Sequence, residues 1–245
     1  MVAIVIPTYN EKDNILRLIK EIDQLYRKND DLLILVADDN SPDGTGKIVQ
    51  AYAKENASKL KIKVITKPDK TGLKDAYFNA FSYALKAYKN LDGVIQMDAD
   101  LSHNPKYLKT HINNLKNSVD LSIGSRYVHG GGVENWSFKR KLLSRVGNTT
   151  NRLVLSTKIH DYTGGFNGLS RKALNQILKP GEVTSGGYYF LTEMKYSIIS
   201  NPDLSVNEFP IIFTDRTQGE SKMGSTIILE AFSQLWRIKS RRVPK

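Results

Sequence analysis

Short apolar runs alternate with amphipathic stretches along the first hundred residues of the chain. Three unbroken apolar runs and one alternating run predict four strands, at residues 2–7, 32–37, 93–97 and 61–66. Apolar positions at helical spacing lie between these runs, and the first helix is expected to begin near Glu11 with Thr8 or Asn10 as its cap. The order β-α-β-α-β-α-β permits right-handed parallel crossovers, so we expect an α/β fold with a mostly parallel, Rossmann-like sheet flanked by helices.

The pattern is less regular beyond residue 104. Three consecutive glycines at 130–132 favour a mobile loop or one that folds over a ligand. Basic and apolar residues mix over 139–146, as in an amphipathic helix at an anionic surface or an ordinary surface helix with a solvated face. The other elements expected in this half are helices at 105–117, 171–178, 188–194 and 225–240 and strands at 119–124, 166–170 and 206–213, the last at a sheet edge because it contains a proline.

Acidic and polar side chains follow three of the four early strands. Asn10 and Glu11 follow the first strand, Asp38 and Asp39 the second, and Asp98 and Asp100 the fourth. In a doubly wound sheet the carboxyl ends of the strands line one crevice, where such folds bind ligands. We therefore expect these side chains to meet there and to bind a nucleotide.

The pair Asp98 and Asp100 is the centre of the predicted site. Residues two apart in an extended segment project to the same side, so the two carboxylates repel each other unless a cation lies between them. A hard divalent cation suits such oxygen ligands and would in turn hold phosphate oxygens. The alternative is a polar loop in which one aspartate caps the next helix, since bare D-x-D pairs are common. Neither GxxxxGK[ST] nor a GxGxxG after a strand occurs in the chain.

Composition narrows the classes of partner. The 245 residues fit one large domain or one domain with an appendage, and the absence of cysteine excludes disulfides and thiolate metal sites. The formal net charge of +11 indicates an anionic partner, namely nucleic acid, a lipid surface or phosphorylated small molecules, or else a lysine-rich solvated surface. No apolar run approaches the roughly 20 residues that cross a bilayer, and the apolar start is too short for a signal peptide, so we expect a cytosolic protein.

Five motifs occur in an order that resembles a known family. They are PTYNE at 7–11, DDNSPDGT at 38–45, MDADLSHNP at 97–105, GSRY at 124–127 and DRTQGESK at 215–222. Over nearly the whole chain they resemble the inverting family 2 glycosyltransferases of GT-A fold. The last two, with the glycine-rich loop at 130–132, resemble the polyprenyl-phosphate branch, the dolichol-phosphate mannose synthases.

The resemblance implies roles for individual residues. Asp98 and Asp100 would hold Mg²⁺ or Mn²⁺ on the pyrophosphate, with Ser102 where some members have a glutamine ligand. Asp100, Arg126 and Arg216 would be catalytic. The nucleotide-sugar site would comprise Pro7, Tyr9, Glu11, Asp38, Asp39, Asp98 and Lys222. The acceptor phosphate would contact Arg126, Arg140, Ser144 and Arg216.

The resemblance also implies an activity. It is the inverting, metal-dependent transfer of mannose from GDP-mannose to dolichyl or another polyprenyl phosphate. Residues 1–223 would form the catalytic domain, with a nucleotide-binding half at 1–117 and an acceptor half at 118–223, and 224–245 a basic amphipathic helix and tail. The protein would work peripherally at the cytosolic face of a membrane, through an anionic lipid surface or a small membrane-anchoring subunit, and would bind no nucleic acid.

Two other functions and several side-chain roles stay open at this stage. One alternative is transfer of glucose or another sugar from UDP-glucose or a related donor to polyprenyl phosphate. The other is a non-catalytic basic module that binds membranes or nucleic acid, which the acidic strand ends disfavour because nucleic acid would be repelled there. His103 and His160 are interpreted as cap or loop histidines, Trp136 as a packing residue, and Glu193 as a helix residue or, by analogy, a neighbour of the sugar.

Overall fold

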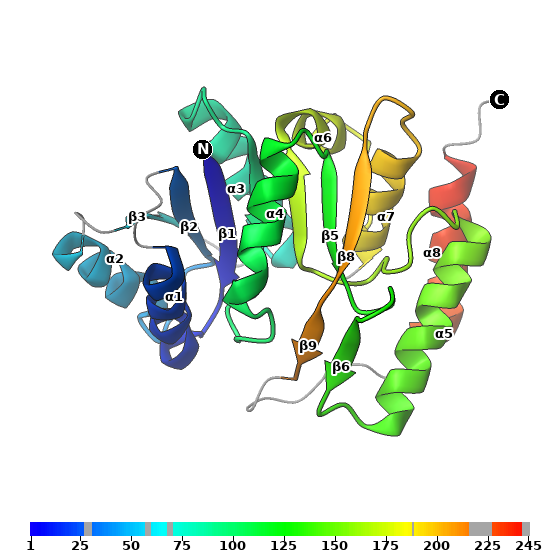
Figure 1. Cartoon of the computed structure of the whole chain (residues 1–245), viewed down its shortest axis with the longest axis horizontal. Helices are drawn as coiled ribbons and strands as arrows, with labels where there is room; N and C mark the ends of the chain where they lie inside the picture. Colours follow the sequence, from blue (N-terminus) through cyan, green and yellow to red (C-terminus); the bar gives the residue numbers. More distant parts are fainter. Residues whose placement is uncertain (27–30, 57–59, 68–70, 188, 216–226, 242–245) are drawn as a thin grey trace.

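The structure, a computed structural model, describes residues 1–26, 31–56, 60–67, 71–187, 189–215 and 227–241, with side chains left out at 227–233. Its centre is a seven-stranded sheet in the order β3-β2-β1-β4-β7-β5-β8 (Figure 1). The strands are β1 Val2–Thr8, β2 Leu32–Asp38, β3 Lys61–Thr66, β4 Gly93–Gln96, β5 Leu121–Ser125, β7 Asn167–Ser170 and β8 Val206–Pro210. Every neighbouring pair is parallel except those that β7 makes with β4 and β5.

The direction of β7 matters for the site. A strand that runs against its neighbours begins where they end, so the loop before β7 lies at the same sheet edge as the carboxyl ends of β4 and β5. The loops after β1 and β2 reach this edge as well, since Thr8 pairs with Asp38 at the last position of their register. One edge of the sheet therefore collects loops from both halves of the sequence.

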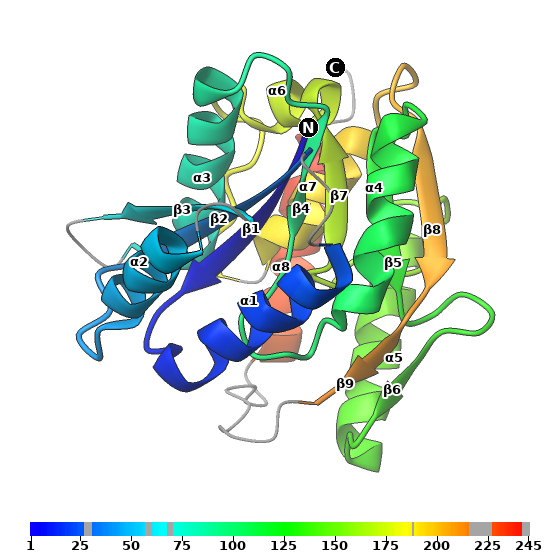
Figure 2. The same ribbon diagram turned by 60° about the vertical axis from the view of Figure 1, so that its left-hand side comes forward.

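Successive side chains along each strand point to opposite faces of the sheet, and the apolar ones form two separate layers. Ala3 and Val5 of β1 belong to one cluster of buried residues, and Val2, Ile4 and Ile6 to the other. The first cluster includes residues of α3 (Leu73–Ala87), α6 (Arg171–Ile177), α7 (Tyr189–Ile199) and α8 (Ile227–Ser240). The second includes residues of α1 (Lys12–Tyr26), α2 (Thr45–Glu55) and α4 (Leu108–Lys116), which follows a single 3₁₀ turn at Pro105–Tyr107. Figure 2 shows α1 and α3 on opposite faces of the sheet.

A smaller unit extends from the edge that collects the loops. Strand β6 (Gly132–Glu134) pairs in parallel with β9 (Ile212–Thr214), and α5 (Phe138–Val154) follows β6 and lies beside α8 (Figure 1). The glycine-rich loop therefore leads into a short strand: Gly132 donates its N–H to the Ile211 carbonyl. A Cβ at Gly131 would lie 2.6 Å from the Ser125 carbonyl oxygen, so this close approach requires glycine.

The sequence predicted the type and order of the early elements, and the structure confirms a mostly parallel α/β sheet flanked by helices. Three details were wrong. The expected strand at 206–213 is two strands, β8 and β9, which lie in different sheets. Leu25, whose helical spacing from Leu18 and Ile22 predicts a place on the apolar face of α1, is instead 56% exposed. Within the described part of the chain, no helix combines the length and apolar character that a membrane span needs.

The third error concerns the start of α1. The N–H groups of Glu11 and Lys12 donate to Thr45 Oγ1 and Asp43 Oδ2, both 3.1 Å away in the segment after β2. Thr8, expected as a cap, instead donates its hydroxyl to Asp38 Oδ1. Two N–H groups at the start of this helix are thus satisfied by side chains of the segment after β2, which fastens the first two loops together.

Candidate functional site

The two aspartates of the D-x-D motif lie in the loop after β4. The Asp98 side chain is 38% exposed, and its Oδ1 accepts a hydrogen bond from the hydroxyl of Tyr77 on α3 at 3.2 Å. Burial, together with the negative charge of Asp98, raises the pKa of Tyr77 well above its ordinary value, so this hydroxyl stays a donor. Asp100 Oδ1 accepts from both the N–H and the hydroxyl of Ser102, at 3.1 and 2.6 Å.

His103 closes this loop from within. Its Nδ1 accepts the backbone N–H of Asp98 at 3.0 Å, and its Nε2 lies 3.9 Å from Asp98 Oδ2. The ring stacks on Phe166 with centroids 4.7 Å apart and is 2% exposed. Burial lowers the pKa of His103, so the imidazole is neutral. The interpretation of His103 as a loop residue is confirmed, but no pattern in the sequence indicates that it is buried.

These residues fit a hard divalent cation. Asp98 and Asp100 provide carboxylate oxygens as ligands. Tyr77 donates a hydrogen bond to Oδ1 of Asp98, and Ser102 donates to Oδ1 of Asp100. A Cβ at Gly165 would stand 3.6 Å from Asp98 Oδ2, so glycine keeps the space beside that oxygen open. Among the described residues no third acidic or histidine ligand joins the two aspartates, so water and phosphate oxygens would complete the shell.

The expected nucleotide pocket lies at the ends of β1 and β2. Asp38 is buried and accepts from the hydroxyls of Thr8 and Ser41, at 2.9 and 2.5 Å, so it braces the loops. Asp39 Oδ2 accepts the N–H groups of Thr71 and Gly72 at 3.3 Å, whereas its buried Oδ1 accepts no hydrogen bond from the described residues and lies 3.7 Å from the Lys67 ammonium. Such an oxygen suits the N–H groups of a nucleobase edge.

Three further residues predicted for this pocket differ in exposure. The structure places Pro7 at the end of β1 and Tyr9 and Glu11 in the loop that follows. Tyr9 is 39% exposed, whereas Pro7 and Glu11 are partly buried. All three therefore lie at the sheet edge where the nucleotide is expected.

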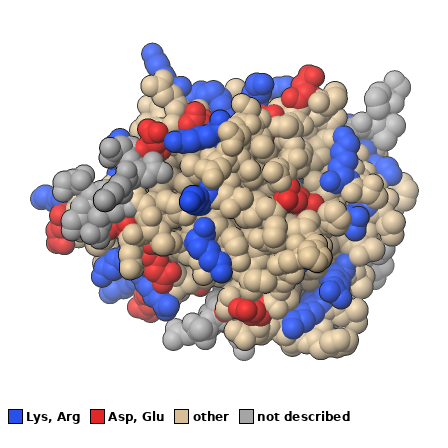
Figure 3. Space-filling model, in the orientation of Figure 1, with Lys and Arg blue, Asp and Glu red and all other residues tan. Residues whose placement is uncertain are grey.

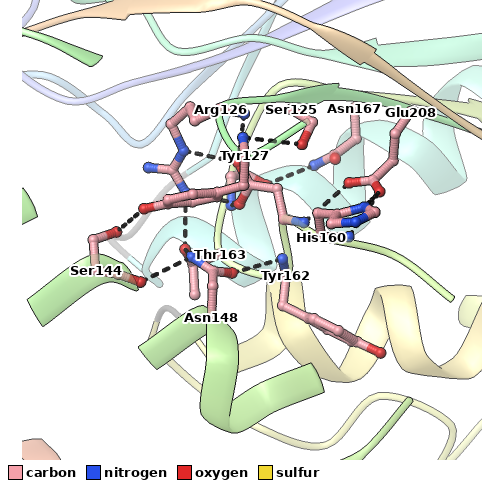
Figure 4. Close-up of polar contacts among 12 residues, drawn as sticks. Ser125, Arg126, Tyr127, Ser144, Asn148, His160, Tyr162, Thr163, Asn167 and Glu208 are labelled. Carbon is pink, nitrogen blue, oxygen red and sulfur yellow. Dashed lines mark hydrogen bonds and ion pairs between the residues drawn. The ribbon is translucent and has the colours of Figure 1, made fainter. Parts of the chain in front are cut away.

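Arg126 follows β5 and is bound by a carboxylate that the sequence did not single out. Its Nε and Nη2 donate to Asp161 Oδ2 and Oδ1, each at 2.8 Å, and Nη2 also donates to Thr163 Oγ1 at 2.8 Å (Figure 4). Burial alone would raise the pKa of Asp161, but the charge and hydrogen bonds of Arg126 hold that pKa well below its ordinary range. A buried, charged and bidentate pair fixes the guanidinium in one orientation.

The loop 161–165 that carries Asp161 is fastened from two sides. Glu208 of β8 accepts the N–H groups of His160 and Asp161, at 2.7 and 3.0 Å, and pairs with the His160 ring at 2.9 Å. From α7, fully buried Lys195 donates its ammonium to the carbonyls of Asp161 and Gly164, at 2.7 and 2.8 Å. Burial lowers the pKa of Lys195 to about 8. The same loop thus presents Asp161 to Arg126 and Gly165 to Asp98.

Hydrogen bonds from α5 complete this side of the site. Ser144 Oγ accepts from the Tyr127 hydroxyl at 2.6 Å, and Asn148 donates to the Ser144 carbonyl and to Thr163 Oγ1 (Figure 4). Asn148 also accepts the Tyr162 N–H at 2.8 Å. Helix α5 is therefore tied to both the segment after β5 and the loop before β7.

Aromatic rings bring a second arginine to the first. The Arg140 guanidinium carbon lies 4.1 Å from the centroid of Trp136, and that of Arg126 lies 5.5 Å from it. Arg140 also pairs with Asp215. Trp136 is 8% exposed, which confirms its interpretation as a packing residue and adds that it packs between two cations.

The structure thus brings together most of the predicted residues that it describes. The loop 161–165 contacts Asp98 through Gly165 and Arg126 through Asp161, while Trp136 packs against both Arg126 and Arg140. Arg216 and Lys222 lie outside the described residues. Glu193, left open between two roles, is buried and accepts the N–H groups of Thr184 and Ser185, at 2.8 and 2.6 Å. Sequence patterns did not reveal the contacts made by Tyr77, Asn148, Asp161, Thr163, Lys195 and Glu208.

Comparisons with known proteins agree with this arrangement. The family model of "Glycosyl transferase family 2" matches residues 3–178. Polyprenol monophosphomannose synthase of Mycolicibacterium smegmatis is 37% identical over 240 residues, which cover 97% of this chain and 87% of that protein. Dolichol-phosphate mannosyltransferase of Pyrococcus furiosus is 35% identical over 97% of this chain, which spans 63% of the length of that relative.

Solved structures support the fold. Glucosyl-3-phosphoglycerate synthase from Mycobacterium tuberculosis, in complex with Mn²⁺, UDP and its product, has a TM-score of 0.63 at 17% identity, covering all of this chain and 81% of that one. A mannosyltransferase from Pyrobaculum calidifontis, in complex with GDP-Man and Mn²⁺, has a TM-score of 0.59 at 20% identity, covering all of this chain and 65% of that one. The fold, the order of the motifs and the family match lead to one conclusion: this chain belongs to glycosyltransferase family 2.

Proposed function

We propose that this glycosyltransferase transfers mannose from GDP-mannose to a polyprenyl phosphate such as dolichyl phosphate, with inversion at the anomeric carbon. The observation that carries the proposal is the loop 161–165, which sets the aspartate pair beside a fixed, buried arginine. One side suits a metal-bound pyrophosphate and the other suits a second phosphate. The names of the two relatives that are at least 35% identical to this chain point to the same acceptor and sugar.

The acceptor side supplies charge rather than a base. A phosphate monoester is already anionic near neutral pH, so its oxygen attacks without a strong general base. Arg126 is oriented by Asp161 and Thr163, and its Nη1 makes no hydrogen bond to the described residues. We infer that Arg126, Arg140 and Ser144 hold the phosphate in line with the anomeric carbon, which lowers the entropic part of the barrier.

The donor side stabilises the leaving group. Asp98 and Asp100 would hold Mg²⁺ or Mn²⁺, which when bound supplies Lewis-acid stabilisation of the departing diphosphate. Pro7, Tyr9, Glu11 and Asp39 would line the guanine and ribose pocket, with Asp38 as its brace. Arg216 is proposed to contact the acceptor phosphate and Lys222 the nucleotide sugar, and residues 1–117 and 118–223 are proposed to serve as donor and acceptor halves.

A membrane surface is the proposed setting, and α5 is the element that would meet it. Its exposed apolar side chains are Phe138, Leu142, Val146 and Leu153, which are 81%, 53%, 52% and 75% exposed. At 3.6 residues per turn these four positions fall within an arc of about 80°. Lys139, Lys141 and Arg145 are exposed on the same helix, and basic side chains gather over this part of the molecule (Figure 3). An apolar stripe with a basic rim suits the interface of an anionic bilayer.

The test is transfer of radiolabelled mannose from GDP-mannose to dolichyl phosphate in detergent, with Mn²⁺ or Mg²⁺, beside the same reaction with labelled UDP-glucose. We expect transfer from GDP-mannose that is lost with EDTA and in Asp100→Ala. Transfer only from UDP-glucose would overturn the choice of donor. If the wild type transfers neither sugar, even with native membranes added, the proposed class of acceptor is wrong.

A further inference from the structure

We infer that His103 is a positioning residue for the metal-binding aspartates: it fixes the backbone of Asp98 and thereby the distance between the two carboxylates. The inference rests on the proposed metal-binding role of Asp98 and Asp100. It assigns to His103 a role that is separate from ligation, since its lone-pair nitrogen, Nδ1, already accepts a backbone N–H.

The first observation is the closure of the loop by a side chain. Asp98 lies beyond the end of β4, and its N–H donates to His103 Nδ1 at 3.0 Å. Between them Leu101 adopts φ +65°, a left-handed conformation that is costly for a residue with a branched side chain. Such a conformation persists only where surrounding contacts impose it, and the imidazole bond is one of these contacts.

The second observation is that the ring itself is held rigidly. Phe166 stacks on one face with an interplanar angle of 10°, and Phe213 meets the ring edge-on with centroids 5.6 Å apart. The protonated Nε2 follows from Nδ1 being an acceptor, and it lies 3.9 Å from Asp98 Oδ2, too far for a hydrogen bond. The aromatic contacts therefore locate the ring, and the ring locates the Asp98 backbone.

The third observation concerns the carboxylates. Tyr77 holds Asp98 by Oδ1, Ser102 holds Asp100 by Oδ1, and His103 holds the chain from which both project. Partners of metal-binding side chains that orient the ligands commonly change metal affinity by 10- to 100-fold when they are removed. Two like charges held close together before the cation arrives make that cation bind more tightly, since less ordering remains to be done.

The chain offers a matched control in His111. This histidine is also fully buried and also packs on Phe166, with centroids 4.6 Å apart, but its Nδ1 bonds to Ser122 Oγ at 3.0 Å rather than to the loop of Asp98. Replacement of either histidine by phenylalanine keeps a ring and removes a hydrogen-bonding nitrogen. Both changes should lower thermal stability, but only the change at His103 should alter the distance between the Asp98 and Asp100 carboxylates.

The experiment measures Mn²⁺ binding by electron paramagnetic resonance in the presence of GDP, together with thermal unfolding of each variant. We expect His103→Phe to weaken Mn²⁺ binding about 10- to 100-fold and His111→Phe to leave it within about twofold of the wild type. His103→Asn, whose amide oxygen reaches the Nδ1 position, should recover most of the affinity. If His103→Phe does not fold, His103→Gln is used instead. The glutamine side chain is one methylene longer than that of asparagine, so its amide lies beyond the position of Nδ1.

Wild-type Mn²⁺ affinity in His103→Phe, or in His103→Gln where that variant is used, would overturn the inference, as would an equal loss in His111→Phe. A different result would show that the proposed metal site is wrong. Asp98→Asn and Asp100→Asn would then bind Mn²⁺ as tightly as the wild type does, and the affinity for GDP without metal would be the same in all variants.

Discussion

Replacing Asp161 by asparagine tests whether the buried ion pair holds the acceptor side together. The carboxylate accepts four hydrogen bonds, from Arg126 N, Nε and Nη2 and from Gly164 N, at 2.8 to 3.1 Å. An asparagine side chain has one oxygen acceptor, so its amide nitrogen would face two of these donors. Arg126 would be left as a buried cation without its counter-charge.

The size of the effect follows from the burial of both partners. Loss of one member of a buried ion pair typically costs about 3–5 kcal/mol, against a total stability of about 5–15 kcal/mol. For a domain of about 150–250 residues each kcal/mol lowers Tm by about 2–4 °C. We therefore expect Asp161→Asn to fold, with a Tm about 6–20 °C lower and a raised KM for polyprenyl phosphate.

The assay is thermal and urea unfolding of Asp161→Asn beside a surface control. Asp31→Asn removes an exposed pair with Lys116, whose atoms are 3.2 Å apart, and should leave Tm unchanged. The double variant Arg126→Leu/Asp161→Asn should lose less stability than the sum of the single variants, because it leaves no unpaired charge. A Tm for Asp161→Asn equal to that of Asp31→Asn would refute the reasoning.

Three other predictions concern acceptor binding, pH and the membrane. Arg126→Ala should raise KM for the lipid acceptor far more than the dissociation constant of GDP-mannose, and equal losses would contradict its role. The pKa of Lys195 is about 8 in the folded protein and 10.5 in the unfolded chain. Between pH 8 and 10.5 the unfolded chain therefore binds more protons, and the free energy of unfolding rises with pH by up to about 3 kcal/mol. Lys195→Met should lack this gain in urea unfolding at pH 8 and 10. Phe138→Ser/Leu142→Ser should bind anionic vesicles at least about tenfold more weakly in a sedimentation assay, and the control Leu25→Ser should bind normally.

The sequence placed the donor-side residues at the ends of strands because the signals are local. Asp98 and Asp100 follow an apolar run that predicts a strand, although β4 ends at Gln96 and Asp100 lies in a turn rather than in the extended segment expected. Asp38 likewise follows an apolar run, although its hydrogen bonds to Thr8 and Ser41 make it a brace. The cap of α1 was assigned wrongly because its partners come from another loop.

The acceptor side could be predicted less well from the sequence because its contacts join residues that are far apart along the chain. Arg126 and Asp161 are 35 positions apart, and no periodicity links them. Nothing in the sequence tells that β7 runs antiparallel, yet this direction brings the Asp161 loop to the site. One usable signal was missed: Lys195 is the single lysine in an apolar helix, and a helix that is apolar all round predicts a buried, paired cation.

The most direct measurement is a mass spectrum of the glycolipid formed when purified protein meets dolichyl phosphate, Mn²⁺, deuterium-labelled GDP-mannose and unlabelled UDP-glucose in one tube. The account predicts that the lipid gains one labelled hexose on its phosphate, and that omission of Mn²⁺ with added EDTA abolishes the product. A lipid that carries only unlabelled hexose, or a labelled product that forms equally with EDTA, would contradict it.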